Sequence, residues 1–457
     1  MGLRLGLFQL SLGSLSVLTL GPLNRLLIQD FGMSAALVSL AIGIQELMGF
    51  SRAWYGHRSD HMPVGVLRRT PFLLGSSLAV FVLFSAAIWV VLQLAESRTF
   101  NASQDTLWMV SLTLIFIGIG TAVSAGGTAF SALIVDLTSE RERTRLLSVV
   151  WSLRLVGVLL ATGLVNRLFG QACEAGASRA DVMQGLQQLM VAAPPILLVL
   201  GVMAVIGVEP RGPSTTAGSE GAPTLQLPLP LPLPLPQLLS TMFAVPQVKR
   251  FMAVMCLFTI AMFLNDVVLE PYGAAIFGMN ICATTALNAL LAVGFLSGLL
   301  LSVFQVVPSM GMVRGCQLGV VMASSALAVM LMAAPEQWQL LFRTAIALFG
   351  LALGICIHSC LNLMFNFLQP GLNAVLMGLW GVGYAYSRGL ASISGGSLLT
   401  MFQTMTRGDA LLSYGGVFGL QIILFLAAAL LLNFLDVQDF RRRMKVNFSE
   451  MMQAISD

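Results

Sequence analysis

Runs of about 20 consecutive apolar residues recur along almost the whole chain, and this repetition most constrains how the chain can fold. At a rise of about 1.5 Å per residue, a helix of that length crosses the roughly 30 Å hydrocarbon core of a bilayer. Only 10% of the 457 residues are charged, against about 25% in a typical soluble domain. Too few charges remain to cover a water-facing surface, so the sequence predicts an all-α, multi-pass integral membrane protein.

We expect twelve membrane spans, which place both termini on one side. Most of the 24 Lys and Arg residues fall in segments of that side, so the positive-inside rule predicts that both termini are cytoplasmic. The first apolar run is too long for a cleaved signal peptide and is expected to be the first span. The net charge of +4 does not indicate a nucleic-acid partner. The expected spans are residues 4–28, 34–54, 71–94, 107–133, 146–168, 188–208, 250–272, 283–306, 314–334, 340–362, 374–402 and 414–435.

A Pro-Leu repeat, LPLPLPLPLP at residues 227–236, divides the chain. Alternating prolines favour an extended polyproline II strand, which suits a spacer. Similar segments, LNRLLI in span one and LNDVVL in span seven, indicate two pseudo-symmetric halves. We therefore predict a six-helix bundle over 1–208, a cytoplasmic linker over 209–247, a second six-helix bundle over 248–436 and a basic cytoplasmic tail over 437–457.

Charged residues inside the spans should find partners, because each costs roughly 2.5–3.5 kcal/mol at the bilayer centre. Pseudo-symmetry predicts that Arg25 pairs with Asp266, or with Glu270 one turn further on, and latches the side opposite the termini; alternatively, Arg25 snorkels to the interface. Glu46 is expected to pair with Arg154 or with another base. The predicted inter-bundle charge pairs are thus drawn from Arg25, Glu46, Arg154, Asp266, Glu270 and Arg388.

Enzyme and metal motifs are not found in the sequence. It has no zinc-ligand spacing, no phosphate-binding Gly-Lys loop and no nucleophile elbow, so we expect neither an enzyme nor a metal centre. Five of the six cysteines lie in or beside apolar runs and Cys173 is alone in a loop, which predicts no disulfide framework. Glycine pairs at four-residue spacing (Gly294/Gly298, Gly350/Gly354 and Gly415/Gly419) predict close helix packing.

The loop between spans two and three, GHRSDHMPVGVLRRTP, resembles the signature loop of the major facilitator superfamily. Its glycines permit a tight turn, its aspartate can accept hydrogen bonds at a helix N-terminus, and its arginines hold it at the cytoplasmic surface. The residues that carry this resemblance are Gly56, Asp60, Gly65, Arg68 and Arg69.

Four further segments resemble one branch of that superfamily, the PucC/LhaA family: LGPLNRLLIQDFG, AFSALIVDLTSERERTRLLSVVWS, DVVLEPYGAAIFGM and GLWGVGYAYSRG. The resemblance implies a major facilitator fold in a cytoplasmic or thylakoid-type photosynthetic membrane. It also implies a role in assembling light-harvesting or photosystem complexes, by binding chlorophyll or bacteriochlorophyll or delivering it to antenna apoproteins. Membrane lipid and pigment-synthesis enzymes are further expected partners. Two other functions stay open: a secondary transporter that works by alternating access, and a protein scaffold that transports nothing.

The magnesium of a chlorin needs one axial donor, and five polar residues could supply it. His358 is the only histidine inside a predicted span, and it could instead be a hydrogen-bonded helix-packing residue. The sequence does not rank the five candidate pigment ligands, which are Asn24, Gln45, Glu46, Asn265 and His358.

Overall fold

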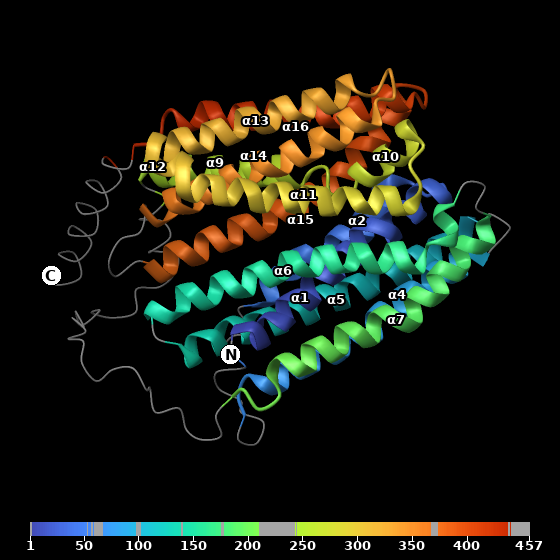
Figure 1. Cartoon of the computed structure of the whole chain (residues 1–457), viewed down its shortest axis with the longest axis horizontal. Helices are drawn as coiled ribbons and strands as arrows, with labels where there is room; N and C mark the ends of the chain where they lie inside the picture. Colours follow the sequence, from blue (N-terminus) through green and yellow to red (C-terminus); the bar gives the residue numbers. More distant parts are fainter. Residues whose placement is uncertain are drawn as a thin grey trace.

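The computed structural model describes residues 2–52, 54–55, 58, 67–96, 102–138, 140–174, 178–209, 243, 245–366, 373–436 and 439. Long helices run side by side through this part of the chain (Figure 1). Ten of them are long and apolar enough to cross a membrane. The protein is therefore an all-helical, multi-pass membrane protein, while the count of twelve spans stays a prediction.

The first group of helices precedes the Pro-Leu linker. It comprises α1 (Gly2–Leu18), the π-helical turns η1 (Thr19–Leu23) and η2 (Leu26–Asp30), α2 (Ala35–Leu47), η3 (Met48–Phe50), α4 (Thr70–Glu96), α5 (Ala102–Leu137), α6 (Glu140–Leu168), η4 (Gln171–Cys173) and α7 (Arg179–Val205). Within this group, α1 packs against α6 and α7, and α4 packs against α5 and α7. The sixth predicted span begins earlier than expected, at Arg179, because Ser178 and Asp181 form a capping box there.

The second group follows the linker. It comprises α9 (Pro246–Phe263), α10 (Leu269–Phe277), α11 (Ile281–Leu301), η5 (Ser302–Val306), α12 (Val307–Met310), α13 (Met312–Met332), α14 (Gln339–Asn366), α15 (Asn373–Met405) and α16 (Ala410–Leu432). Here α14 packs between α11 and α13, and α16 packs against α13 and α9. The groups meet mainly where α2 packs against α15 and α6 against α11, and also where α11 contacts η1 and η4, α10 contacts η2 and α15 contacts η3. Most of the linker 209–247 and of the tail 437–457 lies outside the described residues, and the predicted domain boundaries stay predictions.

Glycines set the closest helix contact, between α11 and α14. A Cβ atom added at Gly298 would lie 1.9 Å from the carbonyl oxygen of Leu351, and one added at Gly354 would lie 2.1 Å from that of Phe295. The two backbones therefore touch directly, as small residues allow in membranes. Gly419 has no such neighbour within 4 Å, so its pair with Gly415 does not serve the same purpose.

The helices of spans one and seven are interrupted at the two similar segments. Pro22 lies in η1, and a proline lacks the N–H group that a regular helical hydrogen bond needs. In span seven, a turn over 264–268 separates α9 from α10. Irregular backbone within a membrane needs protein partners for its polar groups. The side chains around both interruptions therefore matter for the site described next.

Candidate functional site

A cavity lies among α1, α2, α5, α6 and α15. It holds about 530 Å³ of space that no atom fills, including the part that opens to the surroundings. Leu12, Leu15 and Val123 give it apolar walls. Its longer polar side chains are Gln45, Glu46, Arg52, Arg154 and Arg388. A cavity that combines apolar walls with a few converging polar groups is typical of small-molecule sites.

An ion pair crosses this cavity from one helix group to the other. Nη2 of Arg388, on α15, lies 3.1 Å from Oε1 of Glu46, on α2. The guanidinium of Arg388 also lies over the ring of Phe263, 4.7 Å from its centroid. Asp266 is in electrostatic range of the same arginine. Glu46 therefore pairs with another base than Arg154.

Arg154, on α6, faces the cavity without a carboxylate partner among the described residues. Its Nη1 donates a hydrogen bond to Oε1 of Gln9, at 3.2 Å. Its guanidinium lies 5.7 Å from the centroid of the Trp151 ring, one turn earlier on the helix. Both contacting side chains are neutral, and the acid in electrostatic range of Arg154, Glu46, is ion-paired to Arg388.

Arg25 follows α1 at the end opposite the N-terminus. It forms an ion pair with Asp30 rather than with Asp266 or Glu270, although Glu270 is in electrostatic range of it. Its Nη1 is 3.1 Å from Oδ2 of Asp30, and its Nη2 donates to the carbonyl of Met279 at 3.3 Å. The π-helical turns after Pro22 explain the difference, because a wider turn brings residues five apart close together. The side chain is buried and does not snorkel to the interface.

Glu270 is buried near Arg25 and takes a hydrogen bond from Asn288 rather than forming an ion pair. Its other oxygen has no partner among the described residues. Nearby, Asn24 donates from Nδ2 to the carbonyl of Val267 at 2.8 Å, which joins the two interrupted spans. Asparagine thus satisfies a carbonyl that the break in span seven leaves free.

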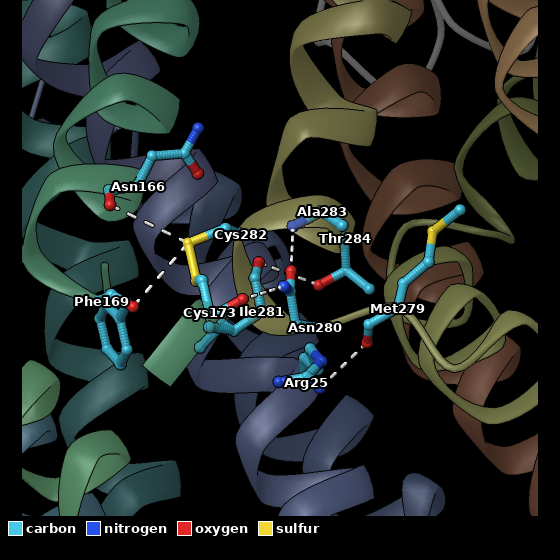
Figure 2. The surroundings of a disulfide bond; sticks show 10 residues. All are labelled: Arg25, Asn166, Phe169, Cys173, Met279, Asn280, Ile281, Cys282, Ala283 and Thr284. Carbon is cyan, nitrogen blue, oxygen red and sulfur yellow. Dashed lines mark hydrogen bonds between the residues drawn. A yellow bond between two sulfur atoms is a disulfide. The ribbon is translucent and has the colours of Figure 1, made fainter. Parts of the chain in front are cut away.

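A disulfide bond between Cys173 and Cys282 covers this end of the molecule, contrary to the prediction of no disulfide (Figure 2). It ties η4, after α6, to the start of α11, and its sequence separation is 109 residues. Asn280 reinforces the link by donating from Nδ2 to the carbonyl of Cys173 at 2.6 Å. We call the end defined by Arg25, Asn280 and this disulfide the disulfide face.

The five candidate pigment ligands differ in whether their donor atoms are already used. Both ring nitrogens of His358 are engaged, Nδ1 with the Ser302 hydroxyl at 3.0 Å and Nε2 with the Asn362 amide at 2.9 Å. His358 is therefore a packing residue. Oδ1 of Asn265 accepts a hydrogen bond from Gln421 at 3.0 Å, deep in the core.

Of the remaining three candidates, Asn24 is fully buried at the disulfide face and does not line the cavity. Glu46 lines the cavity but is paired with Arg388. Gln45 also lines the cavity, and its amide makes no hydrogen bond to another described residue. The amide oxygen of Gln45 is therefore the candidate donor best placed to meet a ligand.

Only part of the signature loop can be described, because Gly56, Asp60 and Gly65 lie outside the described residues. Nε of Arg69 is 3.1 Å from Oδ2 of Asp136. Glu209, just after α7, accepts backbone hydrogen bonds from Arg68 at 2.7 Å and from Thr70 at 2.8 Å. Burial raises the pKa of Glu209, but the backbone N–H groups of Thr70, Arg68 and Arg69 outweigh it and hold this pKa below its ordinary value. This carboxylate therefore caps the N-terminus of α4.

One protein family matches most of this chain. A family model described as PUCC protein matches residues 22–440. The chain belongs to the PUCC protein family. The match takes in the end of span one from Pro22 onward, the whole of span seven, the cavity lining from Gln45 onward and the disulfide.

Relatives of this chain are similar to it over most of their length. "Bacteriochlorophyll synthase 44.5 kDa chain" of Rhodobacter capsulatus is 27% identical, over 94% of this chain and 93% of the relative. "Protein PucC" of Rhodovulum sulfidophilum is 25% identical, over 86% of this chain and 84% of the relative. "Uncharacterized protein in puhA-bchM intergenic region" of Rhodobacter capsulatus is 28% identical, over 86% and 79%.

Solved transporter structures share the fold of this chain. An inward-facing bacterial homolog of the lysosomal transporter Spinster matches with a TM-score of 0.70 and 13% identity, covering 97% of each chain. A D-xylose–proton symporter matches with a TM-score of 0.66 and 13% identity, covering 93% of this chain and 95% of the symporter. At such identities the likeness concerns the fold alone.

The sequence alone did not identify several residues that complete the candidate site. Gln9 solvates Arg154, Asn288 bonds Glu270, and the two half-cystines close the disulfide face. Gln9 and Asn288 could have been identified from the sequence, because an amide side chain within an apolar run also needs a hydrogen-bond partner. The pairing of the cysteines had no local signal.

Proposed function

We propose that this protein is a membrane assembly factor for light-harvesting complexes, which binds bacteriochlorophyll or chlorophyll and hands it to antenna or photosystem apoproteins. Membership of the PUCC protein family is the observation that carries the proposal. The name of one relative refers to bacteriochlorophyll synthesis, which supports a tetrapyrrole ligand and pigment-synthesis enzymes as partners. The protein would hold its ligand without a catalytic centre of its own.

The residues of the cavity fit a chlorin. Its magnesium is a hard cation that favours an oxygen donor, and the Gln45 amide oxygen is free to serve as that ligand. The apolar walls formed by Leu12, Leu15 and Val123 suit the macrocycle. A bound chlorin would supply light absorption, while the protein would orient it and shield it from water. His358 does not fit this role, because both of its ring nitrogens are occupied.

The disulfide face favours this function over alternating access. A transporter must open each side of its cavity in turn, and the Cys173–Cys282 bond ties the two helix groups together at one side. Disulfides persist in oxidising compartments, so the bond also supports the proposal that this face lies outside the cytoplasm and that both termini lie inside it. A pigment chaperone needs no passage through that face.

The test is the pigment content of the full-length protein after isolation from a photosynthetic bacterium in a mild detergent. We expect the wild-type absorption spectrum to show bound (bacterio)chlorophyll and antenna subunits to co-purify. Gln45→Leu should lose most of the pigment, while His358→Ala, the matched control, should keep it.

Two other outcomes would point to the other functions. A colourless wild type that still retains antenna subunits would support a scaffold that binds only protein. Uptake of a small solute into vesicles that appears only after disulfide reduction would support a transporter, and either result would overturn the pigment proposal.

A further inference from the structure

The lining of the cavity carries more positive than negative charge. Arg52, Arg154 and Arg388 face it, and Glu46 is the one acid among its lining residues. Glu46 is already ion-paired, because its Oε1 lies 3.1 Å from Nη2 of Arg388. Asp266 is in electrostatic range of both side chains of this pair but is not part of the lining. The side of the cavity around Arg154 is therefore left positive.

Two features of these half-buried arginines point to a missing anion. Within the part of the chain that the structure describes, Arg154 makes direct contacts only with the neutral side chains of Gln9 and Trp151, while the acid in electrostatic range, Glu46, is ion-paired to Arg388. Separately, Nε of Arg388 is buried and makes no hydrogen bond among these residues. A guanidinium held in a low-dielectric site without a counter-ion is costly, and charges inside membrane proteins usually mark ligand pathways.

We propose that this cavity binds the carboxylate of an amphipathic molecule and that Arg154 is its main anion-binding residue. The planar fork of an arginine matches a carboxylate through two parallel hydrogen bonds. Because Arg154 and Arg388 share the one acid of the lining, Glu46, a single further negative charge would balance them. The walls formed by Leu12, Leu15 and Val123 call for an apolar body attached to it.

The apolar body could be a chlorin whose side-chain acid is not esterified or the chain of a fatty acid. Both share the chemistry that Arg154 would recognise. The inference goes beyond the proposed function and does not depend on it, since it requires an acid group rather than a magnesium ion.

The experiment compares each acid with its own ester on the purified full-length protein in nanodiscs. The probes are chlorophyllide a with its methyl ester, and cis-parinaric acid with its methyl ester, each titrated by fluorescence. We expect at least one acid to bind about tenfold or more tightly than its ester, as a charge-assisted pair provides. Arg154→Gln should abolish this preference, whereas Arg343→Gln, the same change at an exposed arginine on α14, should leave it unchanged.

A second variant keeps the test decisive if Arg154→Gln folds poorly. Glu46→Gln frees Arg388, so it should bind the acid several-fold more tightly than wild type, a gain that misfolding cannot produce. Equal affinity for acid and ester, or no binding of either acid, would overturn the inference. Acid-selective binding of parinaric acid without chlorophyllide would uphold it while counting against the pigment function. Equal binding of chlorophyllide and its ester, without acid-selective binding of parinaric acid, would overturn the inference while supporting the pigment function.

Discussion

At the disulfide face, polar side chains have partners drawn from both helix groups, whereas in the cavity the arginines outnumber the acids. Asn24 bonds Val267, Arg25 bonds Met279, and Asn280 bonds Cys173, each across the boundary between the groups. In the cavity one ion pair crosses that boundary, and Arg154 is left with a neutral acceptor.

This contrast separates the part of the molecule that holds the two groups together from the part suited to receive something. Buried polar groups cost least when they are hydrogen-bonded, so the hydrogen bonds that cross between the groups at the disulfide face add rigidity there. A region with unbalanced charge gives up stability that a ligand can restore. Four variants test this contrast.

Removing the disulfide should have the largest effect. For the double variant Cys173→Ser/Cys282→Ser we expect a loss of about 4 kcal/mol in the free energy of unfolding, because the bond closes a long loop in the unfolded chain. Chemical unfolding in detergent under oxidising conditions would measure it. Cys256→Ser, at an unpaired cysteine, is the control. Equal stability of the two variants would show that the disulfide face does not depend on this bond.

Breaking the cavity ion pair should cost less. Arg388→Met leaves Glu46 without its partner, and we expect a loss of about 2–3 kcal/mol, since the pair is mostly buried. The double variant Glu46→Gln/Arg388→Met should recover part of that loss. Unfolding measurements on all four proteins give the coupling energy, and strictly additive losses would mean that the two side chains do not stabilise each other.

Glu209 should make the end near the termini sensitive to acid. Its pKa is lowered in the folded protein, so its stabilising effect is present above its ordinary pKa of 4.5 and is lost as the pH falls through the lower, folded value. Glu209→Gln should therefore cost about 1 kcal/mol at pH 7, as expected for a lost helix cap. Melting temperatures of the two proteins should converge as the pH falls from 7 to below the folded pKa of Glu209. Glu336→Gln, at an exposed acid, should show no such convergence.

Filling the cavity should have the smallest effect. Ser16 lines it, and its hydroxyl bonds only the Gly13 carbonyl of its own helix among the described residues. We expect Ser16→Leu to change stability by less than about 0.5 kcal/mol, because the larger side chain enters open space. Ser397→Leu, on an exposed part of α15, controls for added hydrophobicity. A loss above about 2 kcal/mol would indicate overpacking and would contradict an open cavity.

Hydropathy was enough to predict most of the fold. The length of each apolar run determines whether it can span a bilayer, so helices such as α13 and α16 lie close to their predicted positions. Local chemistry also explains the interrupted spans, since Pro22 cannot continue a regular hydrogen-bond ladder. The major facilitator fold followed from the family resemblance, not from composition.

Partner choice could not be predicted from the sequence, because it depends on distances between segments far apart in the chain. Arg25 pairs with Asp30, because the π-helical turn η2 brings these two residues close together. A pseudo-symmetric arrangement left Glu46 with more than one possible basic partner. In the structure that partner is Arg388, on α15. His358 appeared free in the sequence, but Ser302 from η5 occupies its ring. The local sequence shows that a buried polar or charged side chain needs a partner, but the tertiary structure determines which residue that partner is.

The Cys173–Cys282 bond has a consequence for biogenesis. Synthesis runs from the N-terminus, so the Cys173 thiol is made 109 residues before its mate and must wait while the ribosome adds the Pro-Leu segment, α9 and α10. The bond can close only after the beginning of α11 has emerged and docked beside α6. Its formation in a living cell would thus report that the two parts of the polypeptide have been inserted and joined.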